Sequence, residues 1–401
     1  MTTRHFAPPN LVSRLPDVGT TIFSVMSQLA ATHQAINLGQ GFPSFDPDPV
    51  LLEAAQRAMR PGNHQYAPMA GLPALREVIA SKTLRLTGQA YDPDTEITVT
   101  AGATQALSSA IAAVVHPGDE VVVIEPFYDS YIPSIRLAGG VPVVVPMRPP
   151  TADDPVFRPD WDRLRAALTP RTRAIMVNFP HNPTCSILTE ADLDALEALV
   201  GGTDILLISD EVYEHIVFDG QPHRSMASRP SLAARSFIVS SFGKTVHATG
   251  WKIGYCCAPP NLTTEFRKVH QFVVYAVNST LQHALAEYMA DPAHYESLSS
   301  FYQQKRDYLA KGLAQAGFEV LPSQGTFFLV AGYRALSRSE PNDFARWLTQ
   351  THGVAVIPLS AFYSPDRASE ARWVRFCFAK TPDVLDAAIK RLEALRPVQP
   401  S

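Results

Sequence analysis

The amino-acid sequence predicts an α/β fold: a mostly parallel central sheet with helices on both faces, joined to a smaller α+β domain. Short β-branched runs alternate with helical segments over much of the chain. These runs lack the apolar–polar alternation of half-exposed strands, so they are expected to be buried on both faces, as in a parallel sheet. The 401 residues exceed what one hydrophobic core usually serves, so two domains are expected.

The large domain is predicted over residues 49–290. Its helices are expected at 48–60, 72–86, 103–115, 161–168 and 190–200, and its strands at 97–100, 121–124, 141–145, 174–177, 205–208 and 237–239. The strand runs are short and bounded by turn residues, whereas the helices show apolar residues at helical spacing. Pro73 fits the first turn of its helix, where proline is tolerated.

The small domain is predicted over residues 291–401. Long helices at 265–289 and 293–316 lead into strands at 318–321, 326–330, 354–357 and 373–378 and helices at 342–351 and 382–395. Residues 1–48 form an arm with one helix at 22–31. This arm is too short to fold alone, so it is expected to join the small domain.

The composition favours a soluble enzyme of a reducing compartment. The net charge is −4 and no basic stripe is visible, so nucleic-acid binding is not expected. The four cysteines show no metal-binding spacing and predict buried free thiols, with no metal site. Residues 1–16 contain no apolar stretch long enough for a signal peptide, and no membrane span is expected. A cytoplasmic location follows.

Chemistry is expected beyond the carboxyl ends of the strands, where open parallel sheets bind ligands. After 97–100, the small residues Gly102 and Ala103, with Thr104, open a helix whose N-terminus suits an anion; a simple strand-to-helix turn is the alternative. After 121–124, the three aromatics Phe127, Tyr128 and Tyr131 stand in a segment that predicts a flat wall for a ring or ordinary core packing.

Three further strand ends carry polar side chains. Asn182, after 174–177, is either a fixed amide or a turn residue. Asp210, after 205–208, is either a buried carboxylate that needs a partner or a helix N-cap. After 237–239, Ser241, Lys244 and Lys252 predict one amine for chemistry and a hydroxyl and second amine for an anion. Jointly these groups describe a pocket for pyridoxal phosphate: an aldehyde needs a lysine amine, and a ring nitrogen needs an acid.

The chain resembles the class I, fold type I, pyridoxal-phosphate-dependent aminotransferases over residues 18–395. Within them it is similar to the group of bacterial methionine aminotransferases and kynurenine–oxoglutarate transaminases. The resemblance is carried by an ordered set of motifs: Asn37-Leu38-Gly39-Gln40-Gly41-Phe42-Pro43, Asn63-His64-Gln65-Tyr66-Ala67-Pro68, Thr100-Ala101-Gly102-Ala103-Thr104, His181-Asn182-Pro183-Thr184, Ser209-Asp210-Glu211-Val212-Tyr213-Glu214, Ser240-Ser241-Phe242-Gly243-Lys244 and Arg375-Phe376-Cys377-Phe378.

The resemblance implies a role for each matching residue. Lys244 would form the Schiff base and Asp210 would pair with the pyridine nitrogen, while Tyr213 and Asn182 would bind the phenolic oxygen. The phosphate would be bound by Gly102, Ala103, Thr104, Ser241 and Lys252, and by Tyr66 of the other subunit of a homodimer with shared active sites. Tyr128 would stack on the ring, with Phe127 as the competing residue.

The resemblance also implies a substrate site. Arg375 would bind the α-carboxylate, assisted by Asn182 and the backbone near Gly41, because the planar fork of arginine pairs with both oxygens. Phe42, Phe328 and Tyr66, with Ile22 and Phe23 of the partner subunit, would surround the side chain. Two positions depart from common family patterns: Cys185 stands where glycine is frequent, and Lys252 where aspartate aminotransferases carry arginine.

The expected reaction is ping-pong transamination through pyridoxamine phosphate, from methionine or an aromatic, kynurenine-like donor to a 2-oxo acid. A lyase that cleaves the Cβ–S bond of cysteine conjugates is the main alternative, since it would use the same residues. A ligand-sensing regulator is a remote alternative, because only a short arm precedes the Gly39–Pro43 loop and no basic recognition helix is visible.

Overall fold

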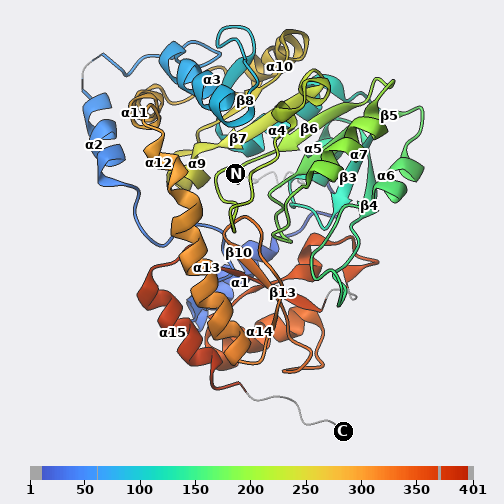
Figure 1. Ribbon diagram of the computed structural model, residues 1–401, viewed down its shortest axis with the longest axis vertical. Helices are drawn as coiled ribbons and strands as arrows, with labels where there is room; N and C mark the ends of the chain where they lie inside the picture. Colours follow the sequence, from blue (N-terminus) through green and yellow to red (C-terminus); the bar gives the residue numbers. More distant parts are fainter. Residues whose placement is uncertain (1–10, 61, 369–371, 396–401) are drawn as a thin grey trace, which may run out of the picture.

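The computed structural model describes residues 11–60, 62–368 and 372–395. The outermost parts of the predicted arm (1–10) and small domain (369–371 and 396–401), with most of the segment searched for a signal peptide, lie outside the described residues. Figure 1 shows a large sheet in the upper half of the molecule and a smaller sheet in the lower half, with helix α13 (Leu298–Gln315) running between them.

The large sheet has seven strands in the order β2-β8-β7-β6-β5-β3-β4. All neighbours are parallel except β8, which is antiparallel to both β2 and β7. The strands are β2 (Ile97–Thr100), β3 (Glu120–Glu125), β4 (Val141–Pro146), β5 (Thr172–Asn178), β6 (Leu206–Asp210), β7 (Ser236–Ser241) and β8 (Gly254–Cys257). The mostly parallel sheet predicted from the apolar runs is confirmed, and the carboxyl ends of β2, β3, β5, β6 and β7 share one edge.

Helices cover both faces of this sheet, as predicted. On one face, α4 (Gly102–Val114), α5 (Tyr131–Leu137) and α10 (Pro260–Val273) enclose a compact apolar cluster that includes Ile111, Val123 and Phe266. On the other lie α2 (Pro49–Ala58), α3 (Pro73–Thr87), α6 (Trp161–Ala167), α7 (Glu190–Val200) and α11 (Ser279–Met289). Burial on both faces explains why β2, β3 and β5 consist almost entirely of buried residues.

The smaller sheet has four strands in the order β12-β13-β10-β9, all antiparallel. They are β9 (Glu319–Val320), β10 (Phe328–Gly332), β12 (Ile357–Pro358) and β13 (Trp373–Cys377), packed with α13, α14 (Pro341–His352) and α15 (Pro382–Leu392). Strand β1 (Ile36–Asn37) pairs with β11 (Val354–Ala355), and α1 (Ile22–Thr32) packs against α14. These contacts attach the arm to the smaller sheet; the domain boundaries themselves stay predictions.

Several elements differ from the sequence predictions. The helix expected over 265–289 is interrupted between α10 and α11, where Tyr275 adopts a left-handed φ of 70° and Asn278 caps α11. The helix expected over 293–316 is divided into α12 (Ala293–Glu296) and α13. Strand β8 and helix α5 were not predicted. The apolar residues keep their helical spacing through both interruptions. The sequence pattern therefore does not show where one helix ends and the next begins.

A buried ion pair connects α3 to the ends of β7 and β8. Lys82 Nζ lies 2.6 Å from Glu214 Oε2 and donates to the Tyr255 hydroxyl at 2.6 Å. Glu214 Oε1 accepts from Tyr255 and from Ser240 Oγ, each at 2.6 Å. Burial raises the pKa of Glu214, but the Lys82 ammonium and these hydrogen bonds outweigh it, so the pKa lies well below its usual value.

Replacing Lys82 with Met is expected to lower the free energy of unfolding at pH 7 by about 3–5 kcal/mol, because Glu214 would stay charged and buried without its partner. The difference from the wild type should shrink below about pH 4, because a carboxylate with a lowered pKa stabilises the fold only while it is ionised. Urea titrations at several pH values measure both effects. Lys311→Met, at an exposed position of α13, is the matched control, and a loss below about 1 kcal/mol in Lys82→Met would contradict the prediction.

Candidate active site

A cavity of about 180 Å³ lies beyond the carboxyl ends of the strands of the large sheet. Ten of the predicted site residues line it: Gly102, Ala103, Thr104, Tyr128, Asn182, Asp210, Tyr213, Ser241, Lys244 and Lys252. They come from loops and helix ends that follow β2, β3, β5, β6 and β7. The parallel strand order therefore places together side chains that are far apart in the sequence.

A larger groove, of about 730 Å³, lies between α2, α3 and α11. Most of its charged side chains are engaged with each other or with neighbours: Arg57 with Glu287, Lys82 with Glu214, and Arg85 with Glu296. The small cavity offers an amine, a carboxylate and a helix N-terminus instead, so it is the candidate active site.

One end of the cavity is built for an anion. Helix α4 begins there, and its N-cap residue, Ala101, provides no side-chain cap. Gly102 has a φ of 77°, and a Cβ at this position would lie 3.3 Å from Lys252 Nζ. Gly254 permits the close approach of β8, since a Cβ there would lie 2.9 Å from the Ala103 amide nitrogen. Uncapped amides, the Lys252 ammonium and the Ser241 hydroxyl fit a phosphate group.

Asp210 is the acid of the site. It is the last residue of β6, aligned with Asn178 of β5, and it is buried. The Tyr131 hydroxyl donates to Asp210 Oδ2 at 2.6 Å, and Asn178 Nδ2 donates to the Asp210 carbonyl at 3.1 Å. Burial raises the pKa of Asp210 to about 6. A carboxylate held in this way suits a protonated ring nitrogen, which would supply the counter-charge that burial demands.

Tyr131 belongs to the aromatic segment that was predicted as a wall for a ring, but its contact with Asp210 was not predicted. It lies at the start of α5, and its hydroxyl reaches Asp210 across the sheet edge. Its neighbour Tyr128 lines the cavity, with the two rings edge to face at 5.8 Å. Phe127 does not line the cavity; its amide donates to the Phe362 carbonyl, 2.9 Å away. Of Phe127 and Tyr128, it is thus Tyr128 that lines the cavity.

Lys244 is the amine of the site. It lies in α9 (Phe242–Thr245), and Ser241 caps this short helix by accepting from the Gly243 amide at 3.3 Å. Lys244 Nζ donates to the Gly41 carbonyl at 3.0 Å and lies 5.1 Å from the Phe327 ring and 5.7 Å from the Tyr213 ring. Burial lowers the pKa of Lys244 to about 8. An appreciable fraction of the amine is therefore neutral, and hence nucleophilic, near neutral pH.

Arg375 borders the cavity from β13. Its guanidinium is fully buried, with Nη1 donating to Asn182 Oδ1 at 2.5 Å and Nη2 to the Gly39 carbonyl at 3.4 Å. It lies 3.8 Å from the Phe328 ring centroid and 4.8 Å from that of Phe362. Arg375 Nε has no hydrogen-bond partner among the residues that the structure describes. A buried cation with an unused donor fits an anionic ligand.

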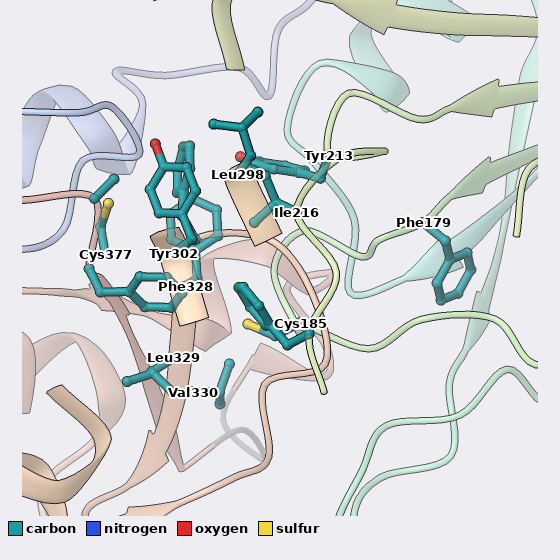
Figure 2. Close-up of a cluster of buried hydrophobic side chains, with 14 of the residues drawn as sticks. Phe179, Cys185, Tyr213, Ile216, Leu298, Tyr302, Phe328, Leu329, Val330 and Cys377 are labelled. Atoms are coloured by element: carbon teal, nitrogen blue, oxygen red, sulfur yellow. The ribbon is translucent and has the colours of Figure 1, made fainter. Parts of the chain in front are cut away.

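The aromatic residues near Arg375 belong to the apolar interior between the two sheets. Figure 2 shows Phe328 of β10 beside Tyr302, with Tyr213 entering from the large sheet. The Tyr213 ring is edge-on to Phe327 at 5.1 Å and lies 6.0 Å from Phe328. Cys185, also drawn in Figure 2, is buried with a φ of 66°, a conformation that favours glycine. Such a conformation would suit the glycine that the family resemblance implies at this position.

Two predicted substrate residues lie elsewhere than expected. Phe42 does not line the cavity. Its ring lies 4.9 Å from Lys380 Nζ, and its carbonyl accepts a hydrogen bond from the same ammonium. Phe23 was assigned to the partner subunit, but its ring lies 5.6 Å from the Arg375 guanidinium of its own chain. Tyr66 is 82% exposed and contacts the Tyr275 ring at 5.3 Å. Tyr66 was expected in the site of the other subunit, which agrees with its absence from the cavity of its own chain and stays a prediction.

Metal and membrane signals are missing from the described part of the chain. No group of three His, Cys, Asp or Glu side chains is arranged there to hold a metal ion. Among the helices of residues 11–60, 62–368 and 372–395, none has the length and apolar character needed to span a membrane.

Comparison with known proteins places the chain in a family. Residues 33–392 match the family model for aminotransferase class I and II. Methionine aminotransferase of Escherichia coli is 49% identical to this chain, over 96% of this chain and 98% of the relative. The crystal structure of the Escherichia coli enzyme superposes with a TM-score of 0.92, over 97% of this chain and 100% of the crystallised chain.

Two further relatives are named for other amino donors. A probable N-succinyldiaminopimelate aminotransferase of Mycobacterium tuberculosis is 43% identical over 96% of this chain and 98% of its own. Kynurenine–oxoglutarate transaminase 1 of Rattus norvegicus is 34% identical over 96% of this chain and 98% of its own. The fold type I architecture and the expected activity are thereby confirmed: the chain belongs to the class I and II aminotransferases and is an aminotransferase.

Proposed function

We propose that this aminotransferase uses pyridoxal 5′-phosphate to move the amino group of methionine, or of an aromatic, kynurenine-like amino acid, to a 2-oxo acid. The observation that carries the proposal is the single cavity in which Lys244, Asp210 and the anion-binding end of α4 converge. The family is generally dependent on this cofactor, and the donor set of the cavity matches each of its polar groups. Arg375 provides a carboxylate site at the same place.

The residues present would hold the cofactor at each end. The amides of Gly102, Ala103 and Thr104, with Ser241 and Lys252, would bind the phosphate, and Asn182 and Tyr213 the phenolic oxygen. Tyr128 would stack on the ring and Asp210 would keep a proton at the ring nitrogen. When bound, the cofactor serves as the sink for the electron pair left at the substrate Cα.

The protein's own groups would then bind and move protons. The Lys244 amine, with its pKa lowered to about 8, would hold the aldehyde carbon and later accept the Cα proton as general base. Arg375 would bind the α-carboxylate with Asn182 beside it, which orients the Cα–H bond toward Lys244. Burial of Asp210, Tyr213 and Arg375 excludes water from these contacts.

The surroundings of Arg375 favour an apolar side chain. The rings of Phe23, Phe328 and Phe362 all lie within 5.6 Å of its guanidinium. The side-chain carboxylate of a dicarboxylic substrate would contact these rings instead of a cation. Methionine and aromatic substrates should therefore be preferred to dicarboxylates. The relatives that act on methionine and on kynurenine support this choice.

A homodimer would complete the site. Tyr66 and Tyr275 are 82% and 50% exposed, and their ring contact joins them into one apolar surface; Phe272, 85% exposed, lies three residues before Tyr275. A second copy of the chain would cover this surface, and Tyr66 would bind the partner's phosphate group. The four buried cysteines, all free, support a reducing, cytoplasmic location.

A panel of amino donors against several 2-oxo acids tests the proposed function. Each donor is supplied to the cofactor-loaded protein, and oxo-acid and amino-acid products are quantified by mass spectrometry. We expect kcat/KM for methionine or kynurenine to exceed that for aspartate by at least about 100-fold. Preference for aspartate, or for N-succinyldiaminopimelate, would refute the substrate assignment.

The same panel distinguishes the lyase. A cysteine conjugate is supplied without an oxo-acid acceptor, and ammonia and pyruvate are measured. Turnover under these conditions that exceeds amino transfer from methionine would favour Cβ–S cleavage as the principal reaction.

A further inference from the structure

The loop from Gly39 to Phe42 contacts two cations of the proposed site. The Gly41 carbonyl accepts from Lys244 Nζ at 3.0 Å, and the Gly39 carbonyl lies 3.4 Å from Arg375 Nη2. Gly41 also lies against Phe328, since a Cβ at this position would be 2.6 Å from the ring. The position of this loop therefore affects both the amine end and the carboxylate end of the site.

Lys380 holds the middle of this loop. Its Nζ donates to the Phe42 carbonyl at 2.9 Å and the Gln40 carbonyl at 3.5 Å, and lies 4.9 Å from the Phe42 ring centroid. The side chain is only 4% exposed. Its partners in the described part of the chain are thus carbonyl oxygens and a ring rather than a carboxylate. Burying an ammonium without hydrogen-bond acceptors costs free energy, and the loop carbonyls offset this cost at Lys380.

Backbone hydrogen bonds join the two ends of the loop to β13 and the residues after it. The Cys377 amide donates to the Leu38 carbonyl at 2.7 Å, and the Ser44 amide donates to the Ala379 carbonyl at 3.0 Å. Within the loop, the Phe42 amide donates to the Gln40 carbonyl at 3.1 Å, and Asn37 Oδ1 accepts from the Gly39 and Gln40 amides at 2.9 and 3.1 Å. The carbonyls on either side of Gly41 are bound by the Lys380 side chain. Lys380 follows β13, the strand that carries Arg375, so one segment of chain positions both the loop and the guanidinium.

We propose that Lys380 is a positioning residue for substrate binding. By binding the carbonyls on both sides of Gly41, it holds the loop where Arg375 and the loop backbone receive the α-carboxylate. The inference rests on the proposed role of Arg375. Amino acid and oxo acid both carry this carboxylate, so Lys380 contributes to the binding of both substrates and acts on KM more than on kcat.

Lys380→Met tests this role, since it keeps the length of the side chain and removes the ammonium. We expect KM for both donor and acceptor to rise about 10- to 100-fold, the effect of losing one or two charge-assisted hydrogen bonds, with kcat changed less than about 3-fold. In the cofactor-free protein, hydrogen–deuterium exchange of the segment from Asn37 to Phe45 should be at least about 10-fold faster.

Two matched variants separate positioning from packing. Lys380→Arg retains donors for the loop carbonyls and should restore KM and exchange to near wild-type values. Lys305→Met removes a neighbouring ammonium that donates to the Lys380 carbonyl and contacts Phe45 and Phe301, but binds no carbonyl of the Gly39–Phe42 loop, and should leave both readouts unchanged.

Unchanged KM and exchange in Lys380→Met would overturn the inference, and so would an equal loss in Lys380→Arg. If the Met variant does not fold, Lys380→Gln, which keeps one neutral donor, should show an intermediate rise in both readouts, and wild-type values there would count against the role. If the wild type transfers no amino group from any donor, the proposed function fails, whereas the exchange rates still decide whether Lys380 holds the loop.

Discussion

Replacing Lys244 with Ala is expected to lower kcat by at least about 10⁴-fold, the upper end of what one positioned general base contributes. The reason is that one amine serves two purposes, as nucleophile toward the cofactor aldehyde and as base at the substrate Cα. No other amine in the described cavity can substitute. Lys252 lies at the anion end, beside Gly102, and Arg375 is a guanidinium held by Asn182.

Two measurements check this prediction. Product formation from methionine is followed over hours, and intact-protein mass is measured after borohydride reduction in the presence of the cofactor. The wild type should gain the mass of one cofactor less one oxygen atom, because the aldehyde oxygen leaves as water and the reduction adds two hydrogens, and Lys244→Ala should gain none. Lys252→Met is the matched lysine control: it should keep the covalent adduct but bind the cofactor more weakly, because only the phosphate contact is lost. A reduced adduct on Lys244→Ala would assign the chemistry to another lysine.

The location of the cavity could be predicted from the sequence because of one geometric rule. Parallel strands end at a common edge, so residues that follow them, such as Asn182, Asp210 and Lys244, must lie near each other whatever the loops do. The register confirms this directly: Asn178 at the end of β5 is aligned with Asp210 at the end of β6. No knowledge of side-chain orientation was needed for that step.

Side-chain partners across the fold could not be predicted in the same way. Tyr131 binds Asp210 from α5, a helix too short to give a periodic signal. The direction of Phe42 is decided by Lys380, which lies 338 residues further along the chain. Both contacts depend on tertiary packing, and neither residue type nor spacing contains that information.

Backbone reversals account for the other differences between the predicted and the observed helices and strands. Tyr275 in a left-handed conformation ends the helical run that its apolar neighbours would continue. Strand β8 was not predicted, and its antiparallel direction follows from the short connection after α9 and not from its own residues. Such features need the three-dimensional context that an individual segment lacks.

Arg375→Lys is expected to lower kcat/KM for methionine by about 10²- to 10⁴-fold, since up to two charge-assisted hydrogen bonds to the α-carboxylate are lost. The substitution keeps the charge but not the planar fork that pairs with both carboxylate oxygens. A lysine ammonium also lacks the flat guanidinium face of Arg375, which lies 3.8 Å from the Phe328 ring centroid and 4.8 Å from that of Phe362. Steady-state kinetics with methionine and with its oxo acid measure the effect on each half-reaction.

An amine without a carboxylate provides the internal control for this variant. With 3-(methylthio)propylamine, which has the side chain of methionine but no α-carboxylate, Arg375 has nothing to bind, so the slow deamination rate should be the same in wild type and Arg375→Lys. The borohydride-reduced adduct should form equally in both proteins, because Lys244 and the anion end of the cavity are intact. An equal loss of rate with the amine and with methionine would show that Arg375 supports the structure of the site and does not recognise the substrate carboxylate.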